Sequence, residues 1–316
     1  MGRKIKIGTR GSPLALVQAE IVKAKLLRVH PDFTPEDIEI IPILTTGDQV
    51  QDRKLIEIGG KGLFTKEIEE QILNGLVDFA VHSAKDMTTE LPQGLALPIF
   101  LEREDVRDAL ISRNDTSLMD LPEGATIGTS SLRRQAQLLS VRPDFKIIAL
   151  RGNLDTRLRK LKSEGMHAII LACAGLIRLG RYDQVTEALP VDIMLPAPAQ
   201  GAIGLEVREN DREILEILGP LHHEPTGQAV AAERALLGVL DGSCRTPIAA
   251  LATVEGKVLN ITARILSPDG RDKYEIILEG AADEAKIVGV NIGQTLRRTV
   301  GEDVLERIKM EAQPEG

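Results

Sequence analysis

The stretch KIKIGTRGSPLALVQAE, residues 4–20, shows the unit from which most of the chain is built. Residues 4–8 have the pattern of a strand. Ser12 suits the N-cap of a helix and Pro13 its first position, so we expect a helix over 14–27. Because the N–H groups at a helix start attract anions, and Arg10 lies in the connecting turn, the stretch predicts a strand-to-helix junction that can bind an anion.

The same alternation of strand and helix patterns continues to about residue 200. We expect strands at 38–44, 77–81, 125–128, 146–150 and 167–171, and helices at 63–73, 131–139 and 154–162, with a short helix ending at Gly180. Alternation of this kind predicts a largely parallel sheet with crossover helices. Two such sets predict two α/β domains.

The last third of the chain has a different pattern. Residues 202–207 form one more expected strand after Pro196-Ala197-Pro198, where a hinge would let the chain cross back to the first domain. Strands at 248–254, 258–265 and 273–278 and a helix at 282–299 then predict a small α+β domain. We therefore expect an α/β fold of two hinged domains, 1–101 plus 200–219 and 102–199, with a C-terminal α+β domain at 220–316.

Composition limits the classes of function. The 316 residues include no Trp, two Tyr and five Phe, which disfavours binding of single-stranded nucleic acid by base stacking. The net charge of −8 disfavours general DNA or membrane-surface binding. With neither a signal peptide at the start nor an apolar run of the roughly 18 residues that a membrane span needs, we expect a cytoplasmic protein.

Basic residues gather where expected strands lead into helices. They are Arg10, Arg133 and Arg134, Arg151 and Arg157, and Arg178 and Arg181. A single such site would be read as solvated surface charge. Four sites at the carboxyl ends of strands, where open α/β sheets bind ligands, predict a small polyanion instead. Because no Walker-type Gly-Lys-Ser/Thr segment accompanies them, carboxylates are favoured over a nucleotide.

Three further positions carry side chains that could be either reactive or structural. Asp86 follows the strand at 77–81 and is either a turn-capping aspartate or a carboxylate that steadies positive charge; the pattern does not decide. Cys173 lies in an apolar run and is expected to be a structural thiol. Cys244, in the polar turn DGSCRTP at 241–247, has Arg245 beside it to favour the thiolate, which allows a nucleophilic or attachment role.

The sequence also gives expectations for metal binding and for the segment at 45–62. The five histidines are scattered, so no metal site is expected. The polar, glycine-ended segment at 45–62 is either a functional lid or disordered, and we favour a lid.

Several motifs together resemble one family, porphobilinogen deaminase (hydroxymethylbilane synthase), over nearly the whole chain. They occur in the family's order: KGLFTKEIE, VHSAKDM, GTSSLRRQ, LRGNLDTRL, AGLIRLG, PAQGAIGLE and DGSCRTPIA. The resemblance implies an enzyme of tetrapyrrole biosynthesis that condenses four porphobilinogen molecules head to tail, releases ammonia each time, and hydrolyses off the linear product. It also implies a monomer whose first two domains resemble periplasmic ligand-binding proteins, with the active cleft between them. Its partners are porphobilinogen and the growing chain, without nucleic acid or membrane.

The resemblance assigns roles to residues of this chain. Cys244 would carry a dipyrromethane cofactor through a thioether, as a primer made from two porphobilinogen units. Asp86 would be the catalytic carboxylate, stabilising the cationic azafulvene left when ammonia departs, and would also contact the cofactor. The other cofactor-binding positions are Lys85, Ser131, Arg133 and Arg134. The substrate-binding positions are Arg10, Ser12, Arg151, Arg157, Arg178 and Gln200.

This chain departs from the family pattern at two places. Glu57 stands where some members have a lysine, and Met87-Thr88 replaces a more usual apolar-Pro pair.

Two other interpretations compete with this resemblance. A hinged pair of α/β domains would also suit a small-anion receptor or sensor, but a receptor has no need of a covalent anchor such as Cys244. Another enzyme of tetrapyrrole synthesis is the second alternative.

Overall fold

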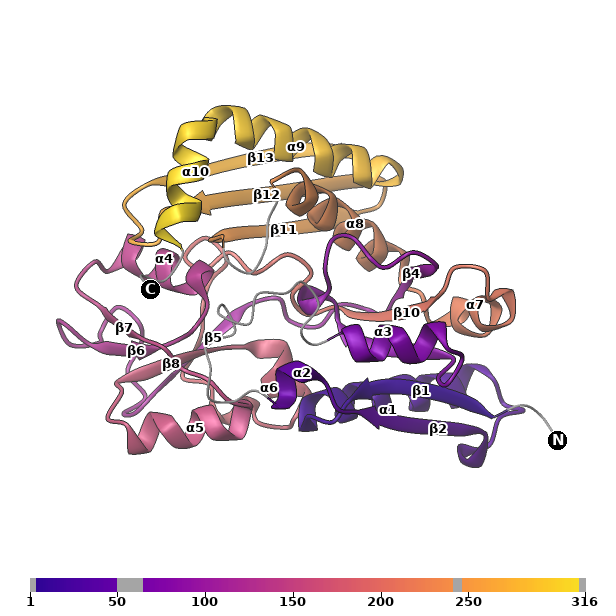
Figure 1. The fold of residues 1–316 in the computed structure, drawn as a ribbon. Helices are drawn as coiled ribbons and strands as arrows, with labels where there is room; N and C mark the ends of the chain where they lie inside the picture. Colours follow the sequence, from indigo (N-terminus) through magenta and orange to yellow (C-terminus); the bar gives the residue numbers. More distant parts are fainter. Residues whose placement is uncertain (1–3, 50–64, 241–245, 313–316) are drawn as a thin grey trace. The chain divides into compact units, whose positions relative to one another are not determined.

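A computed structural model describes residues 4–49, 65–240 and 246–312 (Figure 1). The chain divides into two compact units, residues 1–104 with 202–227 and residues 105–201 with 228–316. The first unit is therefore made of two separate pieces of sequence.

The first unit contains a five-stranded sheet in the order β2-β1-β3-β10-β4. Strand β1 (Ile5–Arg10) pairs in parallel with β2 (Ile38–Ile43) and β3 (Phe79–Ser83), whereas β10 (Ile203–Arg208) runs antiparallel to β3 and to β4 (Leu95–Phe100). The accompanying helices are α1 (Pro13–Val29), α2 (Thr46–Gln49), α3 (Lys66–Leu73) and α7 (Arg212–Leu218). Strand β10 places the segment after residue 200 in this sheet, as the sequence predicted.

Helix α1 forms where the opening stretch predicts it. The Ser12 hydroxyl accepts a hydrogen bond from the backbone N–H of Ala15 at 3.3 Å, which satisfies one of the free donors of the first turn. The helix buries Ala19, Val22 and Leu26 in the core that contains strand residues Ile7 and Phe79. This packing fixes the start of α1 beside the carboxyl end of β1.

The second unit begins with another five-stranded sheet, in the order β7-β6-β8-β5-β9. Strand β6 (Thr126–Gly128) pairs in parallel with β7 (Lys146–Ile148) and β8 (Ala168–Ala172), and β5 (Asp108–Ser112) runs antiparallel to β8 and to β9 (Glu187–Ala188). Its helices are α4 (Leu132–Val141), α5 (Leu154–Ser163) and α6 (Cys173–Arg178).

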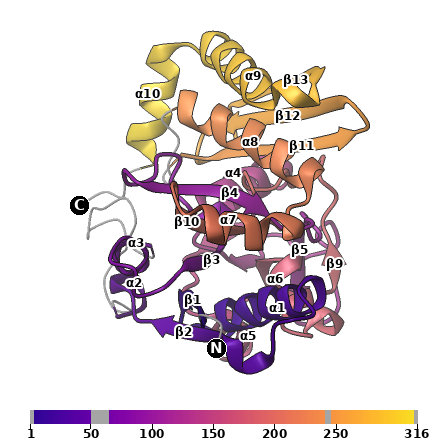
Figure 2. The same cartoon turned by 90° about the vertical axis from the view of Figure 1, so that its right-hand side faces the viewer.

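The C-terminal part of the second unit is an antiparallel sheet covered by helices. Its strands are β11 (Ile248–Glu255), β12 (Val258–Leu266) and β13 (Lys273–Ala281), and its helices are α8 (Glu224–Val239), α9 (Ala285–Val300) and α10 (Glu302–Glu311). Helix α9 runs along the sheet in both views (Figures 1 and 2). A Cβ at Gly289 would lie only 2.1 Å from the Ala232 carbonyl oxygen, so glycine allows α9 to approach α8 closely.

The expected elements are confirmed, with one correction to the topology. Both five-stranded sheets are mixed rather than largely parallel. The reason is the chain path: β10 enters its sheet only after the excursion through residues 105–201, and it runs opposite to β3. Short 3₁₀ helices complete the described chain at Pro35–Asp37, Ala84–Asp86, Tyr182–Gln184, Gly219–Leu221 and Ala282–Glu284.

Candidate functional site

Asp86 lies in the turn that ends β3. The strand stops at Ser83, and the 3₁₀ helix Ala84–Asp86 is held by a hydrogen bond from the Ala84 N–H to the Ala202 carbonyl oxygen at 3.0 Å. Met87, 5% exposed, anchors the end of the turn in the core. The Asp86 side chain itself is exposed, and it lines a pocket of about 430 Å³ that opens to solvent.

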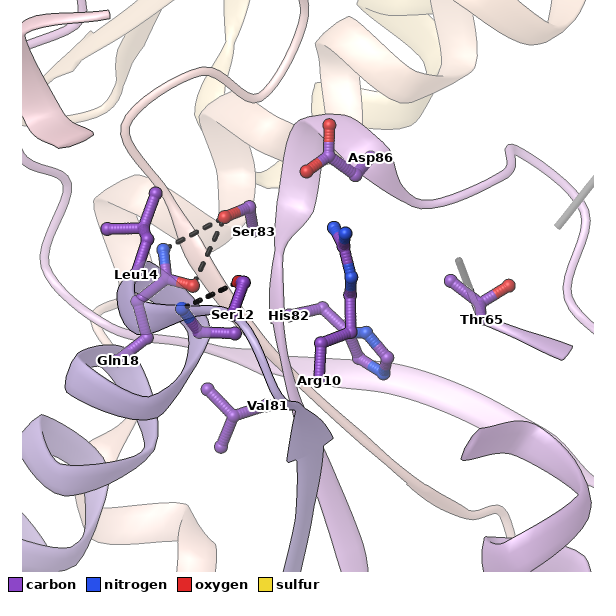
Figure 3. A pocket seen from close by; sticks show the side chains of 10 residues that line it. Arg10, Ser12, Leu14, Gln18, Thr65, Val81, His82, Ser83 and Asp86 are labelled. Atoms are coloured by element: carbon purple, nitrogen blue, oxygen red, sulfur yellow. Dashed lines mark hydrogen bonds between the residues drawn. The ribbon is translucent and has the colours of Figure 1, made fainter. Parts of the chain in front are cut away.

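The pocket brings three predicted site residues together. Arg10, the last residue of β1, and Ser12, the N-cap of α1, line it together with Asp86. Figure 3 shows the Arg10 guanidinium directed toward the Asp86 carboxylate. The pocket therefore lies at the carboxyl ends of two neighbouring strands, where open α/β sheets bind ligands.

The wall of the pocket contains polar residues that the sequence pattern did not single out. Gln18 donates to the Ser83 hydroxyl at 2.9 Å, which ties α1 to the end of β3. His82 also lines the pocket, and its Nε2 lies 3.0 Å from Glu206 Oε2 on β10. Glu206 is fully buried.

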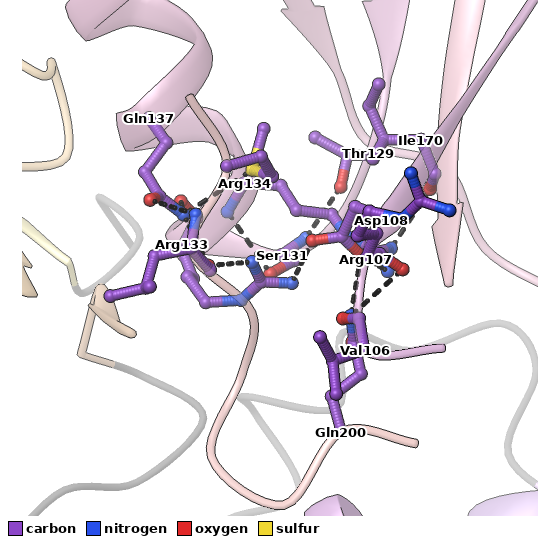
Figure 4. A network of polar contacts seen from close by, with 12 residues as sticks. Val106, Arg107, Asp108, Thr129, Ser131, Arg133, Arg134, Gln137, Ile170 and Gln200 are labelled. Atoms are coloured by element: carbon purple, nitrogen blue, oxygen red, sulfur yellow. Dashed lines mark hydrogen bonds and ion pairs between the residues drawn. The ribbon is translucent and has the colours of Figure 1, made fainter. Parts of the chain in front are cut away.

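A second group of polar side chains lies in the other unit, around Asp108 (Figure 4). Asp108, at the start of β5, is fully buried, and each of its oxygens lies 2.7 Å from an arginine nitrogen: Oδ2 from Arg133 Nη2 and Oδ1 from Arg134 Nη2. Both arginines belong to the first turn of α4 and are only 6% exposed. The sequence predicted the arginines but gave no signal for the aspartate.

This cluster carries an excess of positive charge. Two guanidinium groups face one carboxylate, and arginine keeps its proton in proteins. The pKa of Arg133 lies below its usual value because the group is buried, Asp108 opposes that decrease, and Arg134 adds to it. A buried pair of cations with one counter-ion is suited to receive an anionic group.

Two other predicted residues join the cluster. Gln200 donates from Nε2 to the Val106 carbonyl at 2.7 Å and to Asp108 Oδ1 at 3.1 Å. Ser131 caps α4, with its hydroxyl accepting from the Arg134 N–H at 3.4 Å. The structure thus brings together Ser131, Arg133, Arg134 and Gln200.

The remaining predicted cations lie in or beside the turns and helices that follow other strands: Arg157 is in the first turn of α5, and Arg178 is the last residue of α6. Arg157 Nε donates to the Gly152 carbonyl at 2.8 Å, and Arg178 Nη2 donates to the Gly201 carbonyl at 2.6 Å. Arg151 follows the end of β7, and Lys85 precedes Asp86; both are partly buried. Arg151 and Lys85 therefore lie where strands lead into helices, as the sequence predicted, whereas Arg178 lies at the opposite end of α6 from its strand.

Of the two cysteines, Cys173 lies within the described residues and Cys244 does not. Cys173 is fully buried, and burial raises the pKa of its thiol to about 12, which confirms the expected structural thiol. Cys244 and Arg245 lie outside the described residues, as do Glu57 and most of the expected lid at 45–62. No cluster of potential metal ligands is found within residues 4–49, 65–240 and 246–312. Within the same ranges, no helix is both long and apolar enough to cross a membrane.

Comparison with known families gives a match over most of the chain. Residues 5–216 match the model described as "Porphobilinogen deaminase, dipyromethane cofactor binding domain", and residues 228–298 match the corresponding C-terminal domain. The chain belongs to the porphobilinogen deaminase family. Members of this family are transferases of tetrapyrrole biosynthesis, and the larger matched domain is the one that binds dipyrromethane.

Individual relatives agree with the family assignment. The chain is 51% identical over 296 residues to a porphobilinogen deaminase from Nitrobacter winogradskyi, covering 94% of this chain and 93% of the relative. It is 48% identical over 306 residues to a porphobilinogen deaminase from a Geobacter species, covering 97% and 95%.

Solved structures show more distant likeness. The second substrate-binding domain of a putative amino acid ABC transporter from Streptococcus pneumoniae has a TM-score of 0.43 at 14% identity, covering 69% of this chain and 91% of that domain. The periplasmic VFT2 domain of Bordetella pertussis BvgS has a TM-score of 0.40 at 15% identity, covering 74% and 92%.

Proposed function

We propose that this protein joins four porphobilinogen molecules head to tail, releases one ammonia at each step, and then hydrolyses off the linear hydroxymethylbilane. Family membership supports the reaction class. The structural observation that carries the proposal is the pocket in which Asp86 faces Arg10 at the carboxyl ends of β3 and β1. It places one anion and one cation where a substrate with carboxylates and a developing positive charge would be held.

In this proposal, Asp86 stabilises the cation formed from the substrate. When the C–N bond of the aminomethyl group breaks, the pyrrole nitrogen supplies electrons and an azafulvene cation remains. A fixed carboxylate in the pocket stabilises that charge without having to reorganise. Arg10 would bind a substrate carboxylate, and the Ser12 hydroxyl would add a hydrogen bond, so that the ring is oriented toward Asp86.

The described residues fit a bound dipyrromethane, which carries several carboxylates. Among the described residues, Arg133 and Arg134 share one buried counter-ion, Asp108, so their environment favours further negative charge. We propose that Arg133, Arg134, Ser131, Lys85 and Asp86 hold this group and that Cys244 binds it through a thioether. When bound, the dipyrromethane supplies the pyrrole carbon to which substrate units are joined.

The remaining predicted residues would serve the lengthening product. Each added pyrrole brings an acetate and a propionate, so negative charge accumulates step by step. Arg151 follows β7, Arg157 lies in α5 and Arg178 ends α6, so each could meet carboxylates of a different ring, and Gln200 would add hydrogen bonds. Several separated cations suit a polyanion better than one compact anion.

The proposal also covers nucleic-acid binding, cellular location, oligomeric state and domain boundaries. The net charge of −8 supports a protein that does not bind nucleic acid, and we propose a cytoplasmic monomer. We also propose three domains, 1–101 plus 200–219, 102–199 and 220–316. Separate hydrophobic cores around Ile127 and around Ile261 in the second unit support that division, and limited proteolysis would test it.

The direct test is incubation of the purified protein with porphobilinogen. We expect four ammonia molecules for each linear tetrapyrrole released. A small-anion receptor would bind porphobilinogen without consuming it, and another tetrapyrrole enzyme would leave it unchanged. Either result would exclude the proposed activity.

A further inference from the structure

His82 occupies a position between the pocket and two buried carboxyl groups. It lines the pocket with Arg10 and Asp86, and its Nε2 lies 3.0 Å from Glu206 Oε2. The pairing follows from the sheet: Gly204 on β10 stands opposite His82 on β3, so Glu206 lies two positions along the neighbouring strand, on the same face. Among the described residues, no hydrogen-bond partner is found for His82 Nδ1.

The two acidic side chains of this cluster are buried, and Glu206 is buried more deeply than His82. Glu206 is 0% exposed, and its Oε1 has no hydrogen-bond partner among the described residues. Glu69 on α3 is 7% exposed. Burial raises the pKa of Glu69, the Thr65 hydroxyl and His82 oppose the increase, and Glu206 adds to it. Two buried carboxyls that repel each other electrostatically favour a shared proton or a nearby cation, and His82, with Nε2 3.0 Å from Glu206, is placed to provide one.

We propose that His82, held by Glu206, donates a proton to the ammonia released from the substrate and so assists its departure as ammonium. This inference rests on the proposed function and adds a proton donor to it. The groups that face His82 are Glu206 from β10, Glu69 from α3, Arg10 from β1 and Asp86 from the turn after β3.

Protons and electrons balance when ammonia is released from the substrate. The C–N bond of the substrate's –CH₂–NH₃⁺ group breaks, and its electron pair stays on the nitrogen that leaves as ammonia. The pyrrole nitrogen's lone pair forms the new C=N bond. The imidazolium of His82 then gives its proton to ammonia, which leaves as ammonium and is no longer a nucleophile. The next proton for His82 comes from water.

The test measures the return of ammonia rather than the overall rate alone. The protein is incubated with porphobilinogen and heavy-nitrogen ammonium, and the reaction is stopped before the substrate is exhausted. Heavy nitrogen in the recovered porphobilinogen is compared with the tetrapyrrole formed. Because a residue that gives a proton to departing ammonia must take one from ammonium in the reverse direction, we expect the exchange-to-product ratio of His82→Gln to be roughly 100-fold lower than that of the unaltered protein, the lower end of what one general acid contributes.

Two further variants keep the test independent of folding defects. Glu206→Gln preserves the shape of the side chain but removes its charge, and it should lower the ratio in the same direction. His30→Gln is the matched control, because His30 lies outside the pocket and hydrogen-bonds the Ile217 carbonyl oxygen at 2.7 Å. We expect it to leave the ratio unchanged.

A second readout follows the imidazole directly. Nuclear magnetic resonance of labelled histidine, with the His82 signal identified by its loss in His82→Gln, should show that His82 loses its proton at lower pH in Glu206→Gln than in the unaltered protein. An exchange ratio in His82→Gln equal to that of the unaltered protein would overturn the inference. Absence of tetrapyrrole formation by the unaltered protein would instead overturn the proposed function.

Discussion

Asp108 bridges Arg133 and Arg134, with one carboxylate oxygen 2.7 Å from a guanidinium nitrogen of each. All three side chains are buried, so removal of the shared carboxylate would leave two cations without their counter-ion. The aspartate therefore determines whether the two proposed cofactor-binding arginines can stay where the fold places them.

We expect Asp108→Asn to lower the free energy of unfolding by about 3–5 kcal/mol, the usual cost of breaking a buried ion pair from one side. Chemical denaturation of the protein would measure it. The exposed Asp32 supplies the control, and Asp32→Asn should change the free energy of unfolding by less than about 0.5 kcal/mol. Equal stability of the two variants would contradict the role given to Asp108.

Asp86→Asn should leave the fold intact and remove nearly all turnover. The side chain is exposed in the pocket, so its loss costs little packing, but the cation formed from the substrate loses about 3–4 kcal/mol of stabilisation. Asp86→Glu keeps the charge and displaces it, so it should be less damaging. Steady-state rates with porphobilinogen would decide, and near-normal turnover of Asp86→Asn would rule out the proposed role.

The arginines should act at different stages of chain growth. Arg133→Leu and Arg134→Leu should impair loading of the dipyrromethane, whereas Arg178→Leu, at the end of α6, should stall elongation. Mass spectrometry of trapped enzyme-bound intermediates would show the stage. Arg271→Leu is the control, since that side chain is 87% exposed. If all three site variants stalled at one stage, the staged assignment would be wrong.

The buried thiol of Cys173 predicts a loss of stability at alkaline pH. Burial raises its pKa from 9.0 to about 12, so the folded state keeps a proton that the unfolded state gives up. The contribution is fully present below pH 9.0 and is lost as pH rises toward 12, about 1.4 kcal/mol over the first pH unit. The pH dependence of unfolding, compared with that of Cys173→Ala, would measure it. Identical dependence in both proteins would contradict this assignment.

The sequence was sufficient to predict most of the elements because their signals are local. Ser12 and Pro13 define the start of α1, and Ser131 defines the start of α4. The placement of cations at strand ends followed from the same junctions. The antiparallel pairs of the two large sheets were not predicted. The direction of β10 and of β5 depends on the path by which the chain enters each sheet, and a local sequence pattern does not show that path.

The buried acids of the candidate site could not be found from local pattern. Asp108 is one of several acidic residues in a charged segment, and only the folded sheet shows that it is buried beneath Arg133 and Arg134. His82 and Glu206 are 124 positions apart, and they meet only through the register of β3 and β10. Non-local contacts of this kind carry no periodic signal in the sequence.

The attachment of dipyrromethane to Cys244 is the central claim, and intact mass of the protein purified without added ligand tests it most directly. The account predicts a mass above that of the sequence by two linked pyrrole rings, with peptide mapping placing them on Cys244 and none on Cys173. Cys244→Ala should lose both the added mass and the activity, while Cys173→Ala should keep both. A fully active protein with the unmodified sequence mass would contradict the account.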